Sequence, residues 1–95
     1  MSKFFAIDEI MTERTQAKDV TESTSVLTKL ARSKDVITRI AVAANVSTLT
    51  DDLTRLAKDK DWGVRAAVAT NVFTLAETRA ILKSDSNTWV RDAAK

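Results

Sequence analysis

Apolar and polar residues recur in the same order along residues 30–55 and residues 56–81. Aligned, the two segments read LARSKDVITRIAVAANVSTLTDDLTR and LAKDKDWGVRAAVATNVFTLAETRAI, and 12 of the 26 positions are identical. A shorter third copy follows over residues 82–95, and partial matches precede the first. Repetition at a fixed period is the sequence signature of repeat proteins. We therefore predict one domain over residues 1–95, built on a 26-residue unit.

Each unit is predicted to contain two short helices. Asp35, Asp61 and Asn87 are expected N-caps of the second helix, whose end is expected at an asparagine in the first two units. Thr48 and Thr74 precede an acidic residue by three positions, which is the spacing of a capping box at the start of the first helix. The first helices are expected near 24–33, 50–59 and 76–84, and the second helices near 36–44, 62–70 and 88–94.

The apolar stripe of the second helix predicts how the units pack. Thr38, Ala41, Val42 and Asn45 lie three or four residues apart, and their counterparts repeat in the later units. No unit can bury such a stripe alone, so the units must stack into a short α-solenoid. The alanines expected to make room for a neighbouring backbone are Ala41, Ala67 and Ala93. The expected units are 19–45, 46–71 and 72–95.

The first 18 residues are predicted to form an N-terminal capping helix. Its helical core, expected over residues 3–16, places Phe4, Ile7, Ile10 and Met11 at helical spacing. These four side chains are expected to pack on the first repeat unit. The predicted fold is therefore all-α.

Residues 56–71, LAKDKDWGVRAAVATN, resemble the leucine-rich repeat variant, a HEAT-like bacterial repeat with the pattern LAxDxDxxVRxAVAxN. The resemblance covers residues 19–95 and implies a right-handed superhelix that binds or scaffolds rather than catalyses. Family members usually carry proline at the turn positions that Val46, Leu49, Val72 and Leu75 occupy here. One member carries an iron–sulfur cluster, which does not transfer to a chain without cysteine.

Composition narrows the possible functions. Fifteen basic and thirteen acidic side chains give a net charge of +2, divided evenly between the two halves of the chain. The chain has neither cysteine nor histidine, and it contains no phosphate loop or nucleophile motif. We expect no enzyme activity, cofactor or metal. No apolar run approaches the ~20 residues that span a bilayer, so we expect a cytoplasmic protein without membrane contact.

Arg39, Arg65 and Arg91 repeat at the unit length. Such a column could follow a phosphate backbone. The alternative, which we favour, is that Asp35 and Asp61 neutralise the arginines four residues later through helical ion pairs. Arg91 has Asn87 at that position and is expected to be the freest of the three.

Trp62 and Trp89 are the only tryptophans in the chain. Neither lies on the repeated apolar stripe, so both are expected to be partly exposed near the start of the second helices. Exposed tryptophan is typical of a binding anchor. Alternatively, the two rings fill space between units, with Gly63 making room for them.

The third unit differs from the others at Arg79, which stands where earlier units carry Leu27 and Leu53. The charge predicts that this helix faces solvent or a partner, unless a shift by one residue buries Ile81 or Leu82 instead. The stack also ends without a capping helix after its last repeat. We therefore expect exposed core residues there, Val90 and Ala93, through which the chain could form a homo-oligomer.

These observations favour a non-catalytic adaptor or inhibitor that binds another protein through one face of the helical stack. The expected contact residues are Trp62, Trp89, Arg65, Arg91 and Arg79. The alternative is binding to a nucleic-acid backbone through the repeated arginine and lysine columns. Added salt separates the two, because phosphate binding weakens steeply with salt.

Overall fold

The protein is entirely helical over the part of the chain that can be described. A computed structural model describes the backbone of residues 2–95 and the side chains of residues 8–95. These residues form seven helices and no strand, which confirms the all-α prediction. The helices are α1 (Ser2–Lys18), α2 (Thr24–Leu30), α3 (Val36–Ala44), α4 (Thr50–Leu56), α5 (Trp62–Thr70), α6 (Ala76–Leu82) and α7 (Thr88–Ala93).

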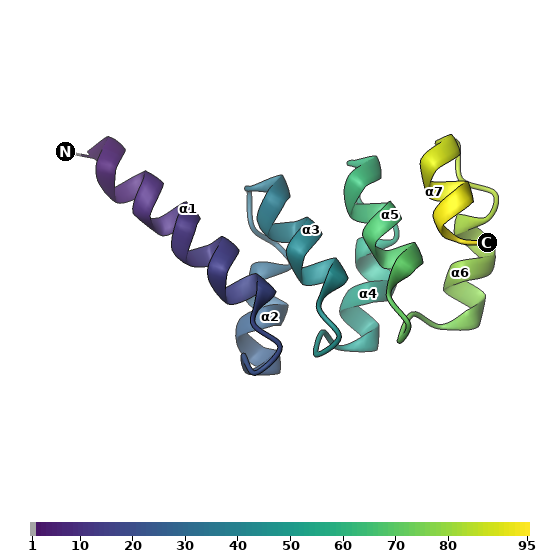
Figure 1. Ribbon diagram of the computed structural model, residues 1–95, viewed down its shortest axis with the longest axis horizontal. Coiled ribbons are helices and arrows are strands. Elements are labelled where there is room, and N and C mark those ends of the chain that lie inside the picture. Colours follow the sequence, from purple (N-terminus) through teal and green to yellow (C-terminus); the bar gives the residue numbers. More distant parts are fainter. Residues whose placement is uncertain (1) are drawn as a thin grey trace.

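The helices form two layers along an elongated body that measures 45 × 25 × 15 Å. In Figure 1, α1, α3, α5 and α7 stand in a row from one end to the other, and α2, α4 and α6 lie behind them. Within the front row, α3 packs between α1 and α5, and α5 packs between α3 and α7. The first residues of α2, α4 and α6 lie 26 positions apart, as do those of α3, α5 and α7.

The core lies between the two layers. Its largest fully buried side chains come from both layers and are Leu27, Leu53, Leu82, Val42, Val64, Val68, Val90 and Thr38. Within residues 8–95, no buried side-chain nitrogen or oxygen lacks a hydrogen-bond partner. The interior is therefore mainly apolar, and each buried polar side chain within it has a hydrogen-bond partner.

Alanines pack closely at two sets of positions: the predicted alanines lie against the core, and a second set is buried more completely. Ala17, Ala43 and Ala69 are fully buried, whereas the predicted set, Ala41, Ala67 and Ala93, is half-buried. The reason is that the backbone carbonyls of Ala17 and Ala43 each accept a hydrogen bond from an asparagine 28 residues later. A methyl group leaves room at that position for the asparagine to reach the backbone.

The N-caps of the second helices are confirmed. The side-chain oxygens of Asp35, Asp61 and Asn87 accept hydrogen bonds from backbone N–H groups in the first turns of α3, α5 and α7. These bonds satisfy N–H groups that have no partner within the helix. The second helices consequently begin at the predicted residues.

The predicted capping boxes are wrong. Helices α4 and α6 begin after Leu49 and Leu75, and no side chain caps them. The hydroxyls of Thr48 and Thr74 instead donate back to carbonyls six residues earlier, at 2.7 and 2.6 Å, in the preceding helix. Both threonines are buried, so they close the turn between two helices rather than start one.

Helix α1 packs differently from the prediction. Phe4 and Ile7 lie outside the described side chains, while Ile10 and Met11 are 36% and 56% exposed. The side chains that attach α1 are Ala17, which is fully buried, and Arg14, which pairs with Asp35 at 2.8 Å. Much of the helix extends beyond the body of the molecule (Figure 1).

Candidate functional site

Two buried asparagines join successive helices of the front row through the backbone. The Asn45 amide donates to the carbonyls of Ala17 and Asp19 at 2.9 and 3.0 Å. The Asn71 amide donates to the carbonyls of Ala43 and Asn45 at 2.9 and 3.1 Å. Both asparagines are 4% exposed. Their role is therefore to fix the distance between neighbouring helices, and they are not available to a ligand.

The arginine column is paired with acids, but not with those predicted. Arg39 Nε donates to Asp59 at 2.9 Å, and Arg65 Nε donates to Asp85 at 2.8 Å. The partner lies 20 residues later in both cases, so the ion pair joins two different helices. The predicted partners, four residues earlier, are wrong because their carboxylates are used as N-caps.

These ion pairs leave little of the arginines for another molecule. The side chains of Arg39 and Arg65 are 11% and 16% exposed. Each also donates to a backbone carbonyl six residues earlier. The hydrogen bond from Arg65 holds the pKa of the Asp85 carboxyl below its usual value, against the opposing effect of its own burial. The first two guanidiniums of the column are thus structural links.

Arg91 is the member of the column that has no carboxylate partner among residues 8–95, as predicted. Its guanidinium donates to the carbonyl of Asp85 at 2.7 Å and to the hydroxyl of Thr88 at 2.9 Å. It forms no ion pair with an acid among residues 8–95. Its charge nevertheless helps to lower the pKa of the nearby Asp85 carboxyl.

Arg79 turns onto the backbone of the preceding helix instead of toward solvent. Its two terminal nitrogens donate to the carbonyls of Ala69 and Asn71, the second at 2.9 Å. Asn71 itself donates to the carbonyls of Ala43 and Asn45. The two carbonyls that Arg79 binds lie 26 residues after these. Arg79 thus occupies the acceptors that a further asparagine of the series would take. No register shift is needed: Leu82 is buried in line with Leu56, and Ile81 is 69% exposed.

The predicted exposure of core residues at the C-terminal end is wrong for Val90. Val90 is fully buried, and so is Ala94, while Ala93 is half-buried. The reason is that α7 presents its apolar side to α5 and the core. This end is not an open hydrophobic surface.

Trp62 and Trp89 form the clearest exposed feature of the molecule. Their ring centroids lie 5.8 Å apart with an interplanar angle of 34°. The two side chains remain 47% and 69% exposed, which confirms the expected exposure. A Cβ on Gly63 would meet Asp61 Oδ1 at 2.9 Å and Ile40 Cδ1 at 3.1 Å. The space at Gly63 is therefore bordered by those two residues.

The Trp pair adjoins the outer side of the front row, which we call the α3/α5/α7 face. This face consists of Ile37, Ile40, Ala41 and Ala44 on α3, Gly63, Ala66, Ala67 and Thr70 on α5, and Trp89, Asp92 and Ala93 on α7. Its residues are exposed or half-buried, and Asp92 is the single charge among them. Near α1 the face includes a groove of about 310 Å³ that Ile37, Ile40 and Ala44 help to line.

Lysines and arginines gather along one edge of the molecule, which we call the basic edge. It is formed by the loops that precede α3, α5 and α7, and its exposed cations are Arg32, Lys34, Lys58, Lys60 and Lys83. None of them forms an ion pair with the acids of residues 8–95. Asp59 and Asp85 belong to the same loops but turn inward to the buried arginines. Although the net charge of the chain is only +2, this edge of the molecule is therefore positively charged.

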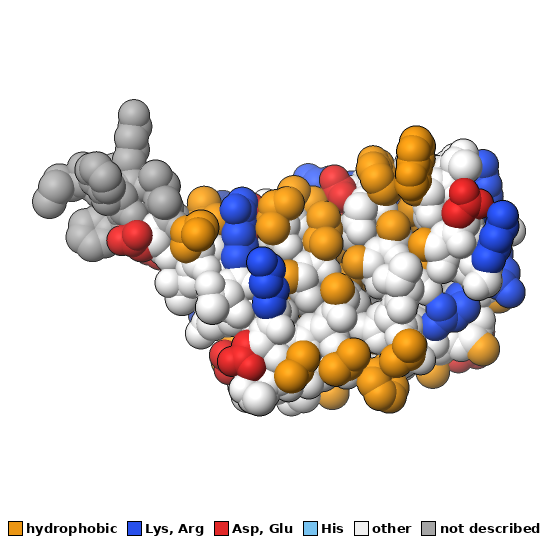
Figure 2. Space-filling view, in the orientation of Figure 1, with side chains coloured by type: hydrophobic (Ala, Val, Ile, Leu, Met, Phe, Trp, Pro, Cys, Tyr) orange, Lys and Arg blue, Asp and Glu red, His pale blue; other side chains and the backbone are white. Residues whose placement is uncertain are grey.

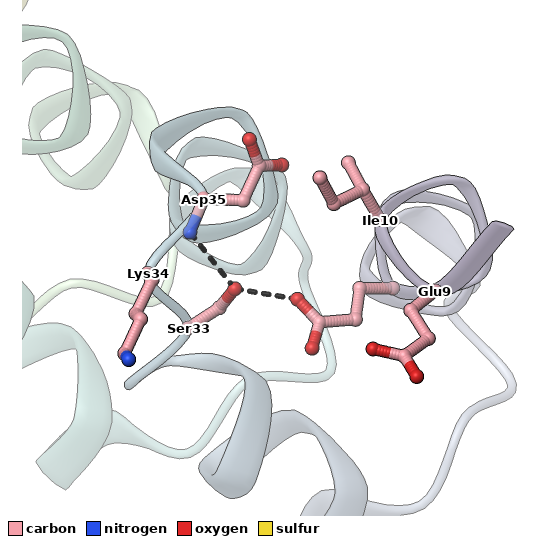
Figure 3. A pocket seen from close by; sticks show the side chains of 6 residues that line it. Glu9, Ile10, Ser33, Lys34 and Asp35 are labelled. Carbon is pink, nitrogen blue, oxygen red and sulfur yellow. Dashed lines mark hydrogen bonds between the residues drawn. The ribbon is translucent and has the colours of Figure 1, made fainter. Parts of the chain in front are cut away.

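A hollow of about 610 Å³ lies between α1 and the loop before α3. Figure 3 shows Glu9, Glu13, Ser33 and Asp35 around it, with the Ser33 hydroxyl donating to Glu13 and accepting from the Asp35 backbone N–H. The hydrogen bond from Arg14 holds the pKa of Asp35 well below its usual value. Each of these polar groups except Glu9 has a hydrogen-bond partner within the chain.

The described residues contain neither a metal-binding cluster nor a helix that could cross a membrane. No group of three or more acidic, histidine or cysteine side chains could hold a metal ion. Similarly, none of the seven described helices combines the length and apolar character needed to cross a bilayer.

The chain was also compared with known proteins. It matches no protein-family model, no curated protein and no solved structure.

Proposed function

We propose that this protein binds another protein, without catalysis, and that the Trp62–Trp89 pair anchors the partner. The observation that carries the proposal is the position of two large rings, from different helices, that lie against each other at a tilt and stay 47% and 69% exposed. Tryptophan is enriched among the few residues that dominate binding energy at interfaces. Pairing restricts both rings before binding, so less conformational freedom is lost when a partner covers them.

The remainder of the α3/α5/α7 face suits the same task. Ala66 and Ala67 follow the Trp pair along α5 and are half-buried, so a partner can approach the helix backbone closely. The groove beside Ile37 would receive an apolar side chain. An interface with apolar residues at its centre and charges at its margin is typical of stable complexes.

The proposal rests on the tryptophans more than on the arginines predicted with them. Arg65 and Arg79 are engaged in hydrogen bonds within the chain, and a partner would have to break these bonds to use them. Arg91 could contribute a charged contact at the margin of the face.

We also infer that the helices form a short right-handed α-solenoid of 26-residue units, as the resemblance to the leucine-rich repeat variant implies. The regular helix starts support this. So do the hydrogen bonds of Asn45 and Asn71, whose acceptors lie 28 and 26 residues earlier in both cases. A solenoid of this kind presents a continuous row of helices to a partner.

The test compares the wild type with the Trp62→Val, Trp89→Ile double variant. These replacements match Val36 and Ile37 at the corresponding positions of α3, so the fold should tolerate them. Proteins captured from the native host by each form are identified by mass spectrometry and then purified for affinity measurement. We expect the variant to bind a true partner at least tenfold more weakly. Equal affinity, with matching thermal unfolding, contradicts the proposal.

Nucleic-acid binding is the second candidate, supported by the basic edge. Most of its cations belong to the predicted lysine and arginine columns, and all of them are exposed and form no ion pair within residues 8–95. Arg39 and Arg65, by contrast, are paired with acids. Anisotropy of labelled single- and double-stranded DNA should then show binding that weakens steeply between 50 and 200 mM salt. The Lys58→Gln, Lys60→Gln variant should reduce that binding. If neither DNA binds at 50 mM salt, the second candidate is wrong.

A further inference from the structure

Opposite the basic edge, the turns that precede α2, α4 and α6 carry a row of exposed apolar side chains. We call this row the valine edge, and its residues are Val20, Val46, Leu49, Val72, Phe73 and Leu75. The exposed fractions of the three valines are 55%, 48% and 75%. Figure 2 shows hydrophobic side chains gathered along this lower edge of the molecule. Contiguous exposed apolar side chains mark interaction surfaces.

The valine edge is held rigidly. The Asn45 amide donates to the carbonyl of Asp19, immediately before Val20, and the Asn71 amide donates to the carbonyl of Asn45, immediately before Val46. Each turn is thus attached to the next at the residue beside its valine. A surface that is already ordered loses little conformational freedom when it binds.

Phe73 departs from the pattern of its own repeat in an informative way. The matching position in the preceding turn is Ser47, whose hydroxyl donates to the carbonyl of Val20. Phe73 cannot form such a bond, and its ring is 57% exposed. A side chain that tied two turns together has been replaced by one that gains little from folding. Where a residue breaks a local rule without benefit to the fold, a functional role is the usual reason.

The charges nearest the valine edge are mainly negative, and the exposed cation beside them is Lys18 at the α1 end of the edge. Residues 19–28, 45–54 and 71–78 contain no lysine or arginine. Asp19, Asp51 and Glu77 are exposed in these segments, and none of the three forms an ion pair with a cation of residues 8–95. Such a surface attracts a cationic partner and is repelled by anionic lipid.

The spacing of the valines fits a helix. Neighbouring packed helices lie about 8–10 Å apart, and so the turns that follow them repeat at a similar distance. Residues seven positions apart in an α-helix are separated by about 10.5 Å. We propose that the valine edge binds a cationic amphipathic helix of another protein. Its apolar side chains would contact the valines and Phe73, and its lysines or arginines would face Asp51 and Glu77.

The valine edge does not include the Trp pair, but it meets the α3/α5/α7 face at the groove, which Val20 and Val46 also line. The decisive variant below changes Val72 and Phe73, which do not line that groove, so the two proposals can fail independently. The probe is a fluorescein-labelled, 18-residue amphipathic helix made of leucine and lysine, and its control replaces every lysine by glutamate. Anisotropy is measured with the full chain. We expect the lysine peptide to bind and the glutamate peptide not to bind. The affinity for the lysine peptide should fall when salt is raised.

The decisive variant is Val72→Ser with Phe73→Ser, because both residues are exposed and Ser47 shows that serine suits the second position. We expect it to bind the lysine peptide at least tenfold more weakly, with thermal unfolding unchanged. The matched control, Trp62→Val with Trp89→Ile, should bind like the wild type. Asp51→Asn with Glu77→Gln should weaken binding and reduce its dependence on salt.

Several results would overturn the inference. Equal binding of the lysine and glutamate peptides would show that charge does not select the partner. Unchanged affinity in the Val72→Ser, Phe73→Ser variant would place the peptide elsewhere. Binding of the wild type to phosphatidylglycerol vesicles but not to the peptide would make the surface a lipid contact. A dimer in sedimentation velocity that this variant abolishes would make it a contact between copies of the chain.

Discussion

For the substitution Arg79→Leu, the repeat pattern and the structure predict opposite changes in stability. Leucine occupies the matching positions of the two preceding units, Leu27 and Leu53, where it is fully buried. Repeat averaging therefore predicts that Arg79→Leu stabilises the protein. The structure predicts the opposite, because the arginine donates to the carbonyls of Ala69 and Asn71, and leucine would leave both without this partner.

The size of the effect follows from these two bonds. A hydrogen bond to a charged group contributes about 1.5–3 kcal/mol. Water can replace part of this, since the Arg79 side chain is half-buried, and the leucine regains about 1 kcal/mol from the apolar area that it buries. We expect a net loss of about 2 kcal/mol. For a domain of this size, 1 kcal/mol corresponds to about 4–8 °C, so the melting temperature should fall by ~10 °C.

The measurement is thermal and urea unfolding followed by circular dichroism at 222 nm. Lys83→Leu is the control for losing a nearby positive charge, because Lys83 is exposed and forms no ion pair with residues 8–95. It should change stability by no more than about 0.5 kcal/mol. If Arg79→Leu is as stable as the wild type, or more stable, then the arginine does not close the series of asparagine bonds as we describe.

Two further predictions concern packing and pH. Gly63→Ala should destabilise the protein by about 1 kcal/mol despite alanine's better helix propensity, because the new Cβ would lie 2.9 Å from Asp61 Oδ1 and 3.1 Å from Ile40 Cδ1. The loss should be smaller in an Ile40→Val background, which urea unfolding of the wild type, the two single variants and the double variant would measure. An equal loss in both backgrounds would contradict this explanation. Asp35 and Asp85 have lowered pKa values in the folded state, so their stabilising contribution is complete above the unfolded pKa of about 3.9 and is lost as the pH falls through the folded values. Urea unfolding between pH 6 and pH 2 should show this loss, and Asp35→Asn with Asp85→Asn should flatten the profile; a wild-type stability that does not change with pH would refute the ion pairs.

The positions of the helices could be predicted closely, because local signals fix them. Asp35, Asp61 and Asn87 cap the helices that follow, and each can be recognised from its neighbours alone. The ends of the first helices were less certain, and α4 stops at Leu56 rather than near residue 59. The residues just after Leu56 form a turn. Whether such residues continue the helix depends on small differences in helix propensity and on tertiary contacts, so the exact end is hard to predict.

Partners of the polar side chains could not be predicted in the same way. Spacing by four residues suggested that Arg39 pairs within its own helix, yet its carboxylate partner, Asp59, lies 20 residues later. Residue spacing in the sequence identifies side chains that are neighbours on the same helix. The ion pairs of Arg39 and Arg65 instead depend on how two different helices are positioned against each other. The signal that would have helped is the repetition of Asp59 and Asp85 one unit apart, alongside Arg39 and Arg65.

The exposed surfaces fall between these cases. Exposure of Trp62 and Trp89 could be predicted because both lie off the buried stripe, but their position against each other could not, since it depends on the distance between α5 and α7. The division into a basic edge and a valine edge was visible in the sequence as segments with and without lysine. That these segments lie on opposite sides of the molecule depends on the fold, in which successive loops alternate between the two sides.

The hydrogen bonds between helices have a consequence for the speed of folding. Among the described residues, no side-chain hydrogen bond joins groups more than 28 residues apart. A chain whose native contacts are so local closes only short loops on the way to its final structure, and the entropic barrier to each closure is small. Refolding after dilution from urea should be complete within milliseconds, at the rate typical of small helical bundles. It should also show no slow phase from proline isomerisation, because the chain contains no proline.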